Sequence, residues 1–166
     1  GALHFHDPRR LGEIKLLDFP DEARPTGVEP LEPGLTQGFL GEITAGSRQA
    51  LKVWLLRQDR LAGIGNIYAS EILFAAGLRP DRPASGLSPE EREAFLHAIR
   101  SVLSEAIRHR GTTLSDYRDA RGIPGGHQAH LRVYGRENET CPRCGARITR
   151  IVQQGRSTFF CPRCQR

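Results

Sequence analysis

The sequence contains no methionine, and its only lysines are Lys15 and Lys52. Its first residue is glycine, whereas a translation product normally begins with methionine, so we expect the chain to be part of a longer protein. No apolar run approaches the roughly 18 residues of a membrane span, and no signal peptide opens the chain, which argues against a membrane protein. No Ser/His/Asp order and no HExxH spacing is present, so the sequence offers no catalytic constellation.

The composition is that of a globular, basic protein. The 166 residues allow one ordinary domain or two small ones, and 38% hydrophobic and 26% charged residues exclude a disordered chain. The formal net charge is +5, and residues 132–166 carry eight arginines against two acids. This local excess of positive charge favours nucleic acid as the partner.

All four cysteines lie in two CPRC motifs near the C-terminus, as Cys141, Cys144, Cys161 and Cys164. Two CxxC turns at this spacing supply the four thiolates of a closed tetrahedral Zn²⁺ site, although two disulfides or a redox pair remain alternatives. The residues between the motifs read as two short strands about a turn at residues 154–156. We therefore predict a zinc-bound β-hairpin with Arg156 at its tip, in a reducing, intracellular compartment.

Helix signals fill the middle of the chain. Thr36 is placed to cap a short helix that runs to about residue 46, and Ser47 to cap a second over residues 48–58. Lys52 in that second helix could extend along apolar surface or bind a phosphate. Ser88 opens a capping box with a proline at the first helical position, and the amphipathic helix that follows should end at Gly111.

A glycine-rich turn at residues 61–65 separates two of these helices. We expect Asn66 to cap the helix that follows and Gly77 to end it in the left-handed conformation. A helix, a tight turn and a second helix resemble a helix-turn-helix element, and the free N–H groups at the start of the second helix could hold a phosphate. A short strand is predicted over residues 131–136, leading into the zinc hairpin.

Four stretches resemble bacterial formamidopyrimidine-DNA glycosylase and, less closely, its sister endonuclease VIII. They are FHDPRRLG (residues 5–12), AGIGNIYASEILFAAGLRP (62–80), VYGR (133–136) and the terminal run around GRSTFFCPRCQ (155–165). The resemblance covers nearly the whole chain but only the C-terminal part of that family.

The resemblance implies an α+β fold in four parts. Residues 1–18, which read as strand, turn and strand, would be the last strands of an N-terminal β-sandwich. Residues 19–36, rich in proline, would be a linker, residues 37–130 a mostly helical helix–two-turn–helix domain, and residues 131–166 a zinc-bound β-hairpin.

The resemblance also implies base-excision repair of oxidised purines, 8-oxoguanine and formamidopyrimidine, by a DNA glycosylase with AP lyase activity. The family uses an N-terminal proline amine, followed by glutamate, as nucleophile, and a lysine of the sandwich assists. This chain starts Gly1-Ala2, so we expect no catalytic residue in it and no base excision by it alone.

The residues that the resemblance carries over are those that hold DNA. Asn66 and Arg156 resemble the phosphate holders, and Lys52 resembles the lysine of the preceding helix. Arg9 matches the arginine that faces the orphan cytosine, a task that suits a long planar donor. Leu11 stands where the family has an aromatic wedge.

The segment from residue 112 to residue 128 matches the loop that closes over 8-oxoguanine, with Gly126-His127 in place of the usual aromatics. Glu71 and Tyr68, in the signature helix, could instead be structural. The expected partner is double-stranded DNA with oxidised bases, bound by a monomer in the bacterial cytoplasm. Two alternatives remain: a stand-alone, non-catalytic zinc-containing DNA-binding module, and a zinc-stapled structural domain of a synthetase-like enzyme.

Overall fold

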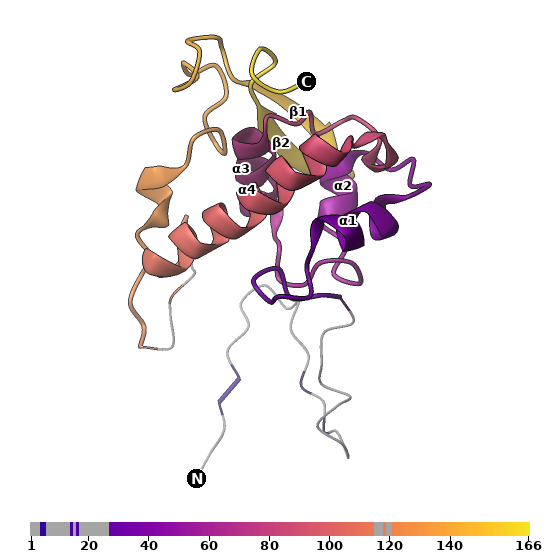
Figure 1. Cartoon of the computed structure of the whole chain (residues 1–166). Coiled ribbons are helices and arrows are strands. Elements are labelled where there is room, and N and C mark those ends of the chain that lie inside the picture. The colour runs from indigo at the N-terminus through magenta and orange to yellow at the C-terminus, as the bar shows by residue number, and fades with distance from the viewer. Residues whose placement is uncertain (1–3, 6–13, 15, 17–26, 115–117, 119–120) are drawn as a thin grey trace.

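The computed structural model describes residues 4–5, 14, 16, 27–114, 118 and 121–166. Its elements are α1 (Gln37–Thr44), α2 (Leu51–Leu55), α3 (Asn66–Ala76), the 3₁₀ turn η2 (Ala84–Gly86), α4 (Pro89–Arg108), the 3₁₀ turn η3 (His127–His130), β1 (Thr149–Gln153) and β2 (Arg156–Phe160). Figure 1 shows α4 running diagonally across the molecule, with α1 and α2 towards its first residues and the orange segment that contains η3 at its last. The predicted mixed class, helices followed by a small hairpin, is confirmed.

The main core lies between α3 and α4. Helix α3 is apolar nearly all round, as expected of a helix that is covered on most sides. Each fully buried large apolar side chain contributes about 1.5–3 kcal/mol, so burial of the side chains in this core is the largest favourable contribution to the stability of the helical part. Its largest buried members are Leu35, Leu40, Leu51, Trp54, Leu55, Leu61, Ile64, Ile72, Leu73, Phe95 and Ile99.

The start of α1 is as predicted and the start of α2 is not. The hydroxyl of Thr36 accepts a hydrogen bond from the Phe39 N–H at 3.1 Å, which caps α1. Helix α2 has only five residues and no side-chain cap, so the predicted cap at Ser47 is wrong. The Ser47 carbonyl instead accepts from the N–H of Ser85 at 3.0 Å, within a short extended pairing of residues 47–50 with residues 83–85.

The ends of α3 and α4 follow the sequence signals with two exceptions. Gly65, not Asn66, is the N-cap of α3, and no side chain caps that helix. Gly77 ends α3 with φ 73°, as predicted. The Ser88 capping box is present with both of its hydrogen bonds, but α4 ends at Arg108, three residues before the predicted Gly111.

The hairpin is closed by a two-residue turn. β1 and β2 pair antiparallel from Thr149 opposite Phe160 to Gln153 opposite Arg156. Gln154 and Gly155 lie between them with φ 47° and 72°, the left-handed geometry that a type I′ turn requires at both positions. Arg156 is therefore the first residue of β2, beside the turn and not within it.

A second, smaller core joins the hairpin to α3. Phe74 of α3 packs with Val133, Ile148 and Phe159 and with two of the cysteines. The guanidinium of Arg143 lies 4.6 Å from the centroid of the Phe74 ring, in cation–π geometry. The hairpin thus depends on α3 for an apolar surface to pack against, since two strands alone bury too little apolar surface.

Residues 131–136 do not form the predicted strand. The backbone N–H groups of Arg132, Val133 and Tyr134 donate to the carboxylate of Glu71 at 2.9, 2.9 and 2.8 Å. Glu71 is only 4% exposed. Burial raises its pKa, while the three N–H donors oppose that rise. The segment bends around a buried carboxylate, so its donors are not available to a neighbouring strand.

The N-terminal part of the prediction falls mostly outside the described residues. The strands expected in residues 1–18 cannot be placed, and the described residues 27–36 contain no helix or strand. Those ten residues nevertheless pack against the helices, with Leu35 fully buried. None of the helices in the described ranges has the length and apolarity needed to cross a bilayer.

We expect Glu71→Gln to lower the free energy of unfolding by about 1–3 kcal/mol, because an amide has one acceptor oxygen and would set an NH₂ group against a buried N–H. Urea unfolding at neutral pH measures the change. Glu93→Gln, an exposed position on α4, is the matched control and should leave the unfolding midpoint in place. Equal stability of both variants would contradict a structural role for the Glu71 carboxylate.

Candidate nucleic-acid interface and metal centre

The four cysteines converge as a tetrahedral ligand set. Cys141 and Cys164 have their sulfurs 3.9 Å apart, Cys144 and Cys161 theirs 3.5 Å apart, and all four lie within 4.8 Å of one another. Zn–S bonds of about 2.3 Å in a tetrahedron place sulfurs about 3.8 Å apart, whereas a disulfide requires about 2.05 Å. The geometry fits one structural zinc ion and excludes the two-disulfide alternative.

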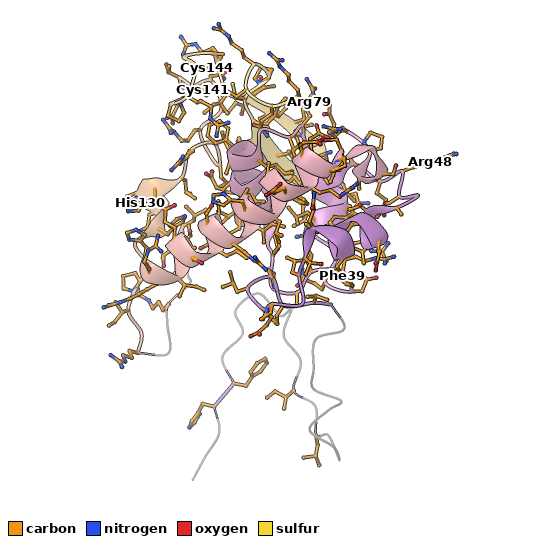
Figure 2. The ribbon with its side chains drawn as sticks, in the orientation of Figure 1. Phe39, Arg48, Arg79, His130, Cys141 and Cys144 are labelled. Atoms are coloured by element: carbon orange, nitrogen blue, oxygen red, sulfur yellow. The ribbon has the colours of Figure 1, made fainter. Side chains whose placement is uncertain are left out.

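Without an ion between them, these thiols differ in acidity. A hydrogen bond from the Ala146 backbone N–H lowers the pKa of Cys144 to about 7. Burial raises the pKa of Cys164 to about 12, because a charged sulfur there would be poorly solvated. A divalent ion at the centre reverses this preference and holds all four groups as thiolates. Figure 2 shows Cys141 and Cys144 at the top of the molecule, at the end of the hairpin that carries its C-terminus.

The predicted DNA-binding residues Lys52, Asn66 and Arg156 come from three different elements and meet at one place. The Lys52 ammonium donates to Asn66 Oδ1 at 2.5 Å, to the Ser157 carbonyl at 3.0 Å and to Thr158 Oγ1 at 2.8 Å. Asn66 Nδ2 donates to the same Ser157 carbonyl at 3.0 Å. Helices α2 and α3 therefore both hold the backbone of β2 next to Arg156.

Lys52 is the most deeply placed of these residues, with only 1% of its surface exposed. Burial and, to a smaller extent, the positive charge of Arg156 together lower its pKa to about 8. Three acceptors compensate the buried ammonium. From the sequence, we expect this side chain to extend along apolar surface or to bind a phosphate. Neither expectation includes the hydrogen bonds that it makes to α3 and β2.

Asn66 also differs from its predicted role as a helix cap. Its side chain turns from the helix start towards the hairpin, where its second N–H reaches the Tyr134 hydroxyl at 3.4 Å. The side chain is half-buried. Tyr134 and Thr158, which the sequence did not single out, complete this network, and no motif in the chain links them to Lys52.

Arg156 remains at the surface. It lines a shallow cavity of about 180 Å³ together with residues of α2 and the hairpin, among them Lys52 and Gln153. Within the described part of the chain, no hydrogen bond or ion pair engages its guanidinium. Three cations line this cavity, and Arg57 among them is paired with Asp59 outside it. Lys52 and Arg156 lie close together with no carboxylate among the lining residues, which is an arrangement that attracts an anion. Arg9 and Leu11 lie outside the described residues, so their predicted roles stay predictions.

Two family models match the chain. The formamidopyrimidine-DNA glycosylase H2TH domain matches residues 26–118, and the "zinc finger found in FPG and IleRS" matches residues 138–166. The chain belongs to the formamidopyrimidine-DNA glycosylase family. The zinc finger alone would have left the synthetase-like alternative open, and the helical domain decides between them.

Relatives of similar sequence are members of the same family. The chain is 45% identical over 168 residues to formamidopyrimidine-DNA glycosylase of Laribacter hongkongensis and 47% identical over 171 residues to that of Desulfitobacterium hafniense. Each match covers 99% of this chain and 62% of the relative. The chain therefore spans less than two thirds of the length of these glycosylases.

Solved structures of the family have the same fold. The MutM (Fpg) protein of Thermus thermophilus matches with a TM-score of 0.86 and 44% identity, over 97% of this chain and 63% of that one. Lactococcus lactis Fpg in complex with DNA that contains an abasic site matches with a TM-score of 0.78 and 35% identity, over 84% of this chain and 51% of that one.

Removal of zinc should unfold the C-terminal module and spare the helices. The hairpin has a small core of its own on Phe74, whereas the main core between α3 and α4 contains none of its residues. We expect a chelator to abolish amide protection over residues 138–166 while most of the helical circular dichroism remains. The zinc-saturated chelator, which cannot take up more zinc, is the control, and a uniform loss of helix would contradict two separable cores.

Proposed function

We propose that this chain is the damaged-DNA-binding part of a DNA glycosylase with AP lyase activity that acts on oxidised purines in double-stranded DNA. The observation that carries the proposal is that, in a member of this family, Lys52 and Asn66 hold the backbone beside Arg156, whose side chain is exposed. This chain covers 62% of a glycosylase relative. We therefore propose the activity, the substrates and a monomeric state for the whole protein.

The local electrostatics support a phosphate beside Arg156. Its charge lowers the pKa of Lys52, which means that the two cations repel each other without an anion nearby. A phosphate oxygen at Arg156 would relieve that repulsion and use a planar, multi-donor group suited to phosphates. The first turn of α3 adds N–H groups beside the exposed Gly65, on the same side as Asn66.

The positioning of Arg156 supports specific contacts. The carbonyl of the next residue, Ser157, accepts hydrogen bonds from both Lys52 and Asn66, and the side chain of Thr158 is held in turn by Gln153 at 2.9 Å. The backbone that carries the guanidinium is thus fixed from two helices and from the opposite strand. A contact made from a fixed backbone loses less entropy on binding.

The relatives support the choice of DNA. Structures of Lactococcus lactis Fpg have been solved with DNA that contains an abasic site and with DNA that contains Fapy-dG. By analogy, we propose that this chain binds duplexes with such lesions more tightly than undamaged duplexes. A stand-alone module without lesion recognition would bind both alike.

We further propose that these 166 residues alone do not excise a base. Covalent catalysis by the family requires an accessible amine. Lys52 is the one lysine in the described ranges, and its ammonium is buried and already bound to three acceptors. It therefore cannot approach a sugar carbon without dismantling the contact between α2 and β2.

Arg156→Ala should weaken binding of a duplex with an abasic-site analogue by roughly tenfold, since a lost charge-assisted contact to a phosphate costs about 1.5–3 kcal/mol. Fluorescence anisotropy at fixed, low salt measures the affinity. Arg163→Ala removes one exposed positive charge from the second CPRC motif, away from the Lys52 network, and serves as the matched control. Equal losses in the two variants would indicate only a general effect of charge.

Borohydride reduction of this chain on a duplex that contains 8-oxoguanine or an abasic site should give no covalent adduct. An intact relative such as the Laribacter hongkongensis glycosylase, treated in parallel, provides the positive control. A trapped adduct on the 166-residue chain would contradict the proposal that it binds DNA without excising a base. Peptide mapping would then locate the amine.

A further inference from the structure

A second group of metal-binding side chains lies where α4 ends, far along the chain from the cysteines. Glu105 and His109 are four residues apart and so share a face of the helix, and His130 approaches them from η3. One ligand atom from each lies within 4.8 Å of the other two. Figure 2 shows His130 beside this end of α4, well away from Cys141 and Cys144.

The backbone fixes the two halves of this group against each other. The N–H of Gly126 donates to the His109 carbonyl at 2.8 Å, and the N–H of His127 donates to the Gly111 carbonyl at 3.0 Å. Gly125 permits this approach, because a Cβ at that position would lie 2.2 Å from the Gly111 oxygen. The ligand set is therefore assembled by main-chain contacts before any ion binds.

The imidazole rings form one compact cluster. The rings of His109 and His130 stack with centroids 3.9 Å apart, and the ring of His127 lies 5.8 and 5.7 Å from them. His127 is only 3% exposed, and among the described residues its buried Nδ1 has no hydrogen-bond partner. A buried imidazole nitrogen without a partner is costly. His127 also lines a small cavity of about 60 Å³ together with Glu105, His130 and Arg132.

The carboxylate of Glu105 is similarly available. Within the described part of the chain, no hydrogen bond or ion pair engages it. It lies close enough to His127 to act on that ring electrostatically. Two imidazoles and one carboxylate are a common ligand set for Zn²⁺ and related divalent ions, with one position left for water or a further ligand.

We propose that Glu105, His109 and His130 bind a second divalent transition-metal ion, with zinc as the preferred ion and a water molecule in the remaining position. Zinc bonds of about 2.1 Å in a tetrahedron place ligand atoms about 3.4 Å apart. On binding, the ligand atoms must therefore close from within 4.8 Å to that separation, and the stacked rings of His109 and His130 must turn so that one nitrogen of each points at the ion. The bound ion fastens η3 to α4 and thereby fixes both ends of the segment from residue 112 to residue 126.

The stacked pair alone has a simpler explanation, as two neutral rings in van der Waals contact. That explanation does not account for the free carboxylate of Glu105 beside the two imidazoles. It also predicts no response of the cluster to added metal. The two explanations therefore differ in a directly measurable way.

Zinc titration by calorimetry tests the proposal on the tag-free chain whose four cysteines already hold one zinc ion. We expect one further equivalent to bind. His130→Asn, at an exposed position, should abolish that equivalent or weaken it at least about tenfold, since loss of even an outer-sphere partner commonly costs that much. His97→Asn, an exposed histidine earlier on α4, is the matched control and should retain the second equivalent.

Nuclear magnetic resonance of the histidine rings in the unmutated chain gives an independent measurement that needs no variant. Added zinc should shift the ring signals of His109 and His130 and leave those of His97 unchanged. The proposal is overturned if the zinc-loaded chain takes up no further ion, if the two His→Asn variants behave alike, or if the rings do not respond.

Discussion

The ammonium of Lys52 is the contact on which the arrangement of the rest depends. A charge this deeply buried is tolerated only when its donors are matched, and here the three acceptors come from α3 and from β2. Removing either α3 or β2 would leave this charge short of acceptors in the interior. Lys52 therefore couples the helical core, which holds itself together by apolar burial, to a hairpin that cannot do so.

The zinc ion and Lys52 act at opposite ends of that hairpin. The four cysteines close its base, where the chain enters and leaves, while Lys52 and Asn66 hold the start of β2 near the turn. Between them, Phe74 of α3 supplies the apolar side chain against which the hairpin packs. Two short strands would not stay folded with any one of these supports alone, and the three together place Arg156 at a defined point on the surface.

The parts of the fold that were predicted correctly from sequence rest on local chemistry. The cap at Thr36, the capping box at Ser88 and the left-handed stop at Gly77 each depend on residues within one turn of each other. The zinc ligands were recognisable because each CxxC motif presents two thiolates in one turn. Arg156 was placed near the hairpin tip for the same reason, since Gln154 and Gly155 specify the turn beside it.

The incorrect predictions share a different cause, which is competition from residues distant in the chain. Asn66 has a good side chain for a helix cap, yet its amide bonds to Lys52 and to the Ser157 carbonyl, 91 residues away. Residues 131–136 alternate like a strand, yet their N–H groups turn to Glu71. Propensity decides only where no stronger tertiary partner is present.

The histidines illustrate the same limit for a candidate site. His109 and His130 are 21 positions apart and fit no ligand spacing, and nothing in the sequence indicates that Gly125 lets their segments touch. A metal motif within one turn can be read from the chain because local geometry brings its ligands together. A site built across two elements depends on the packing of those elements, so the contact between α4 and η3 determines whether Glu105, His109 and His130 can act together.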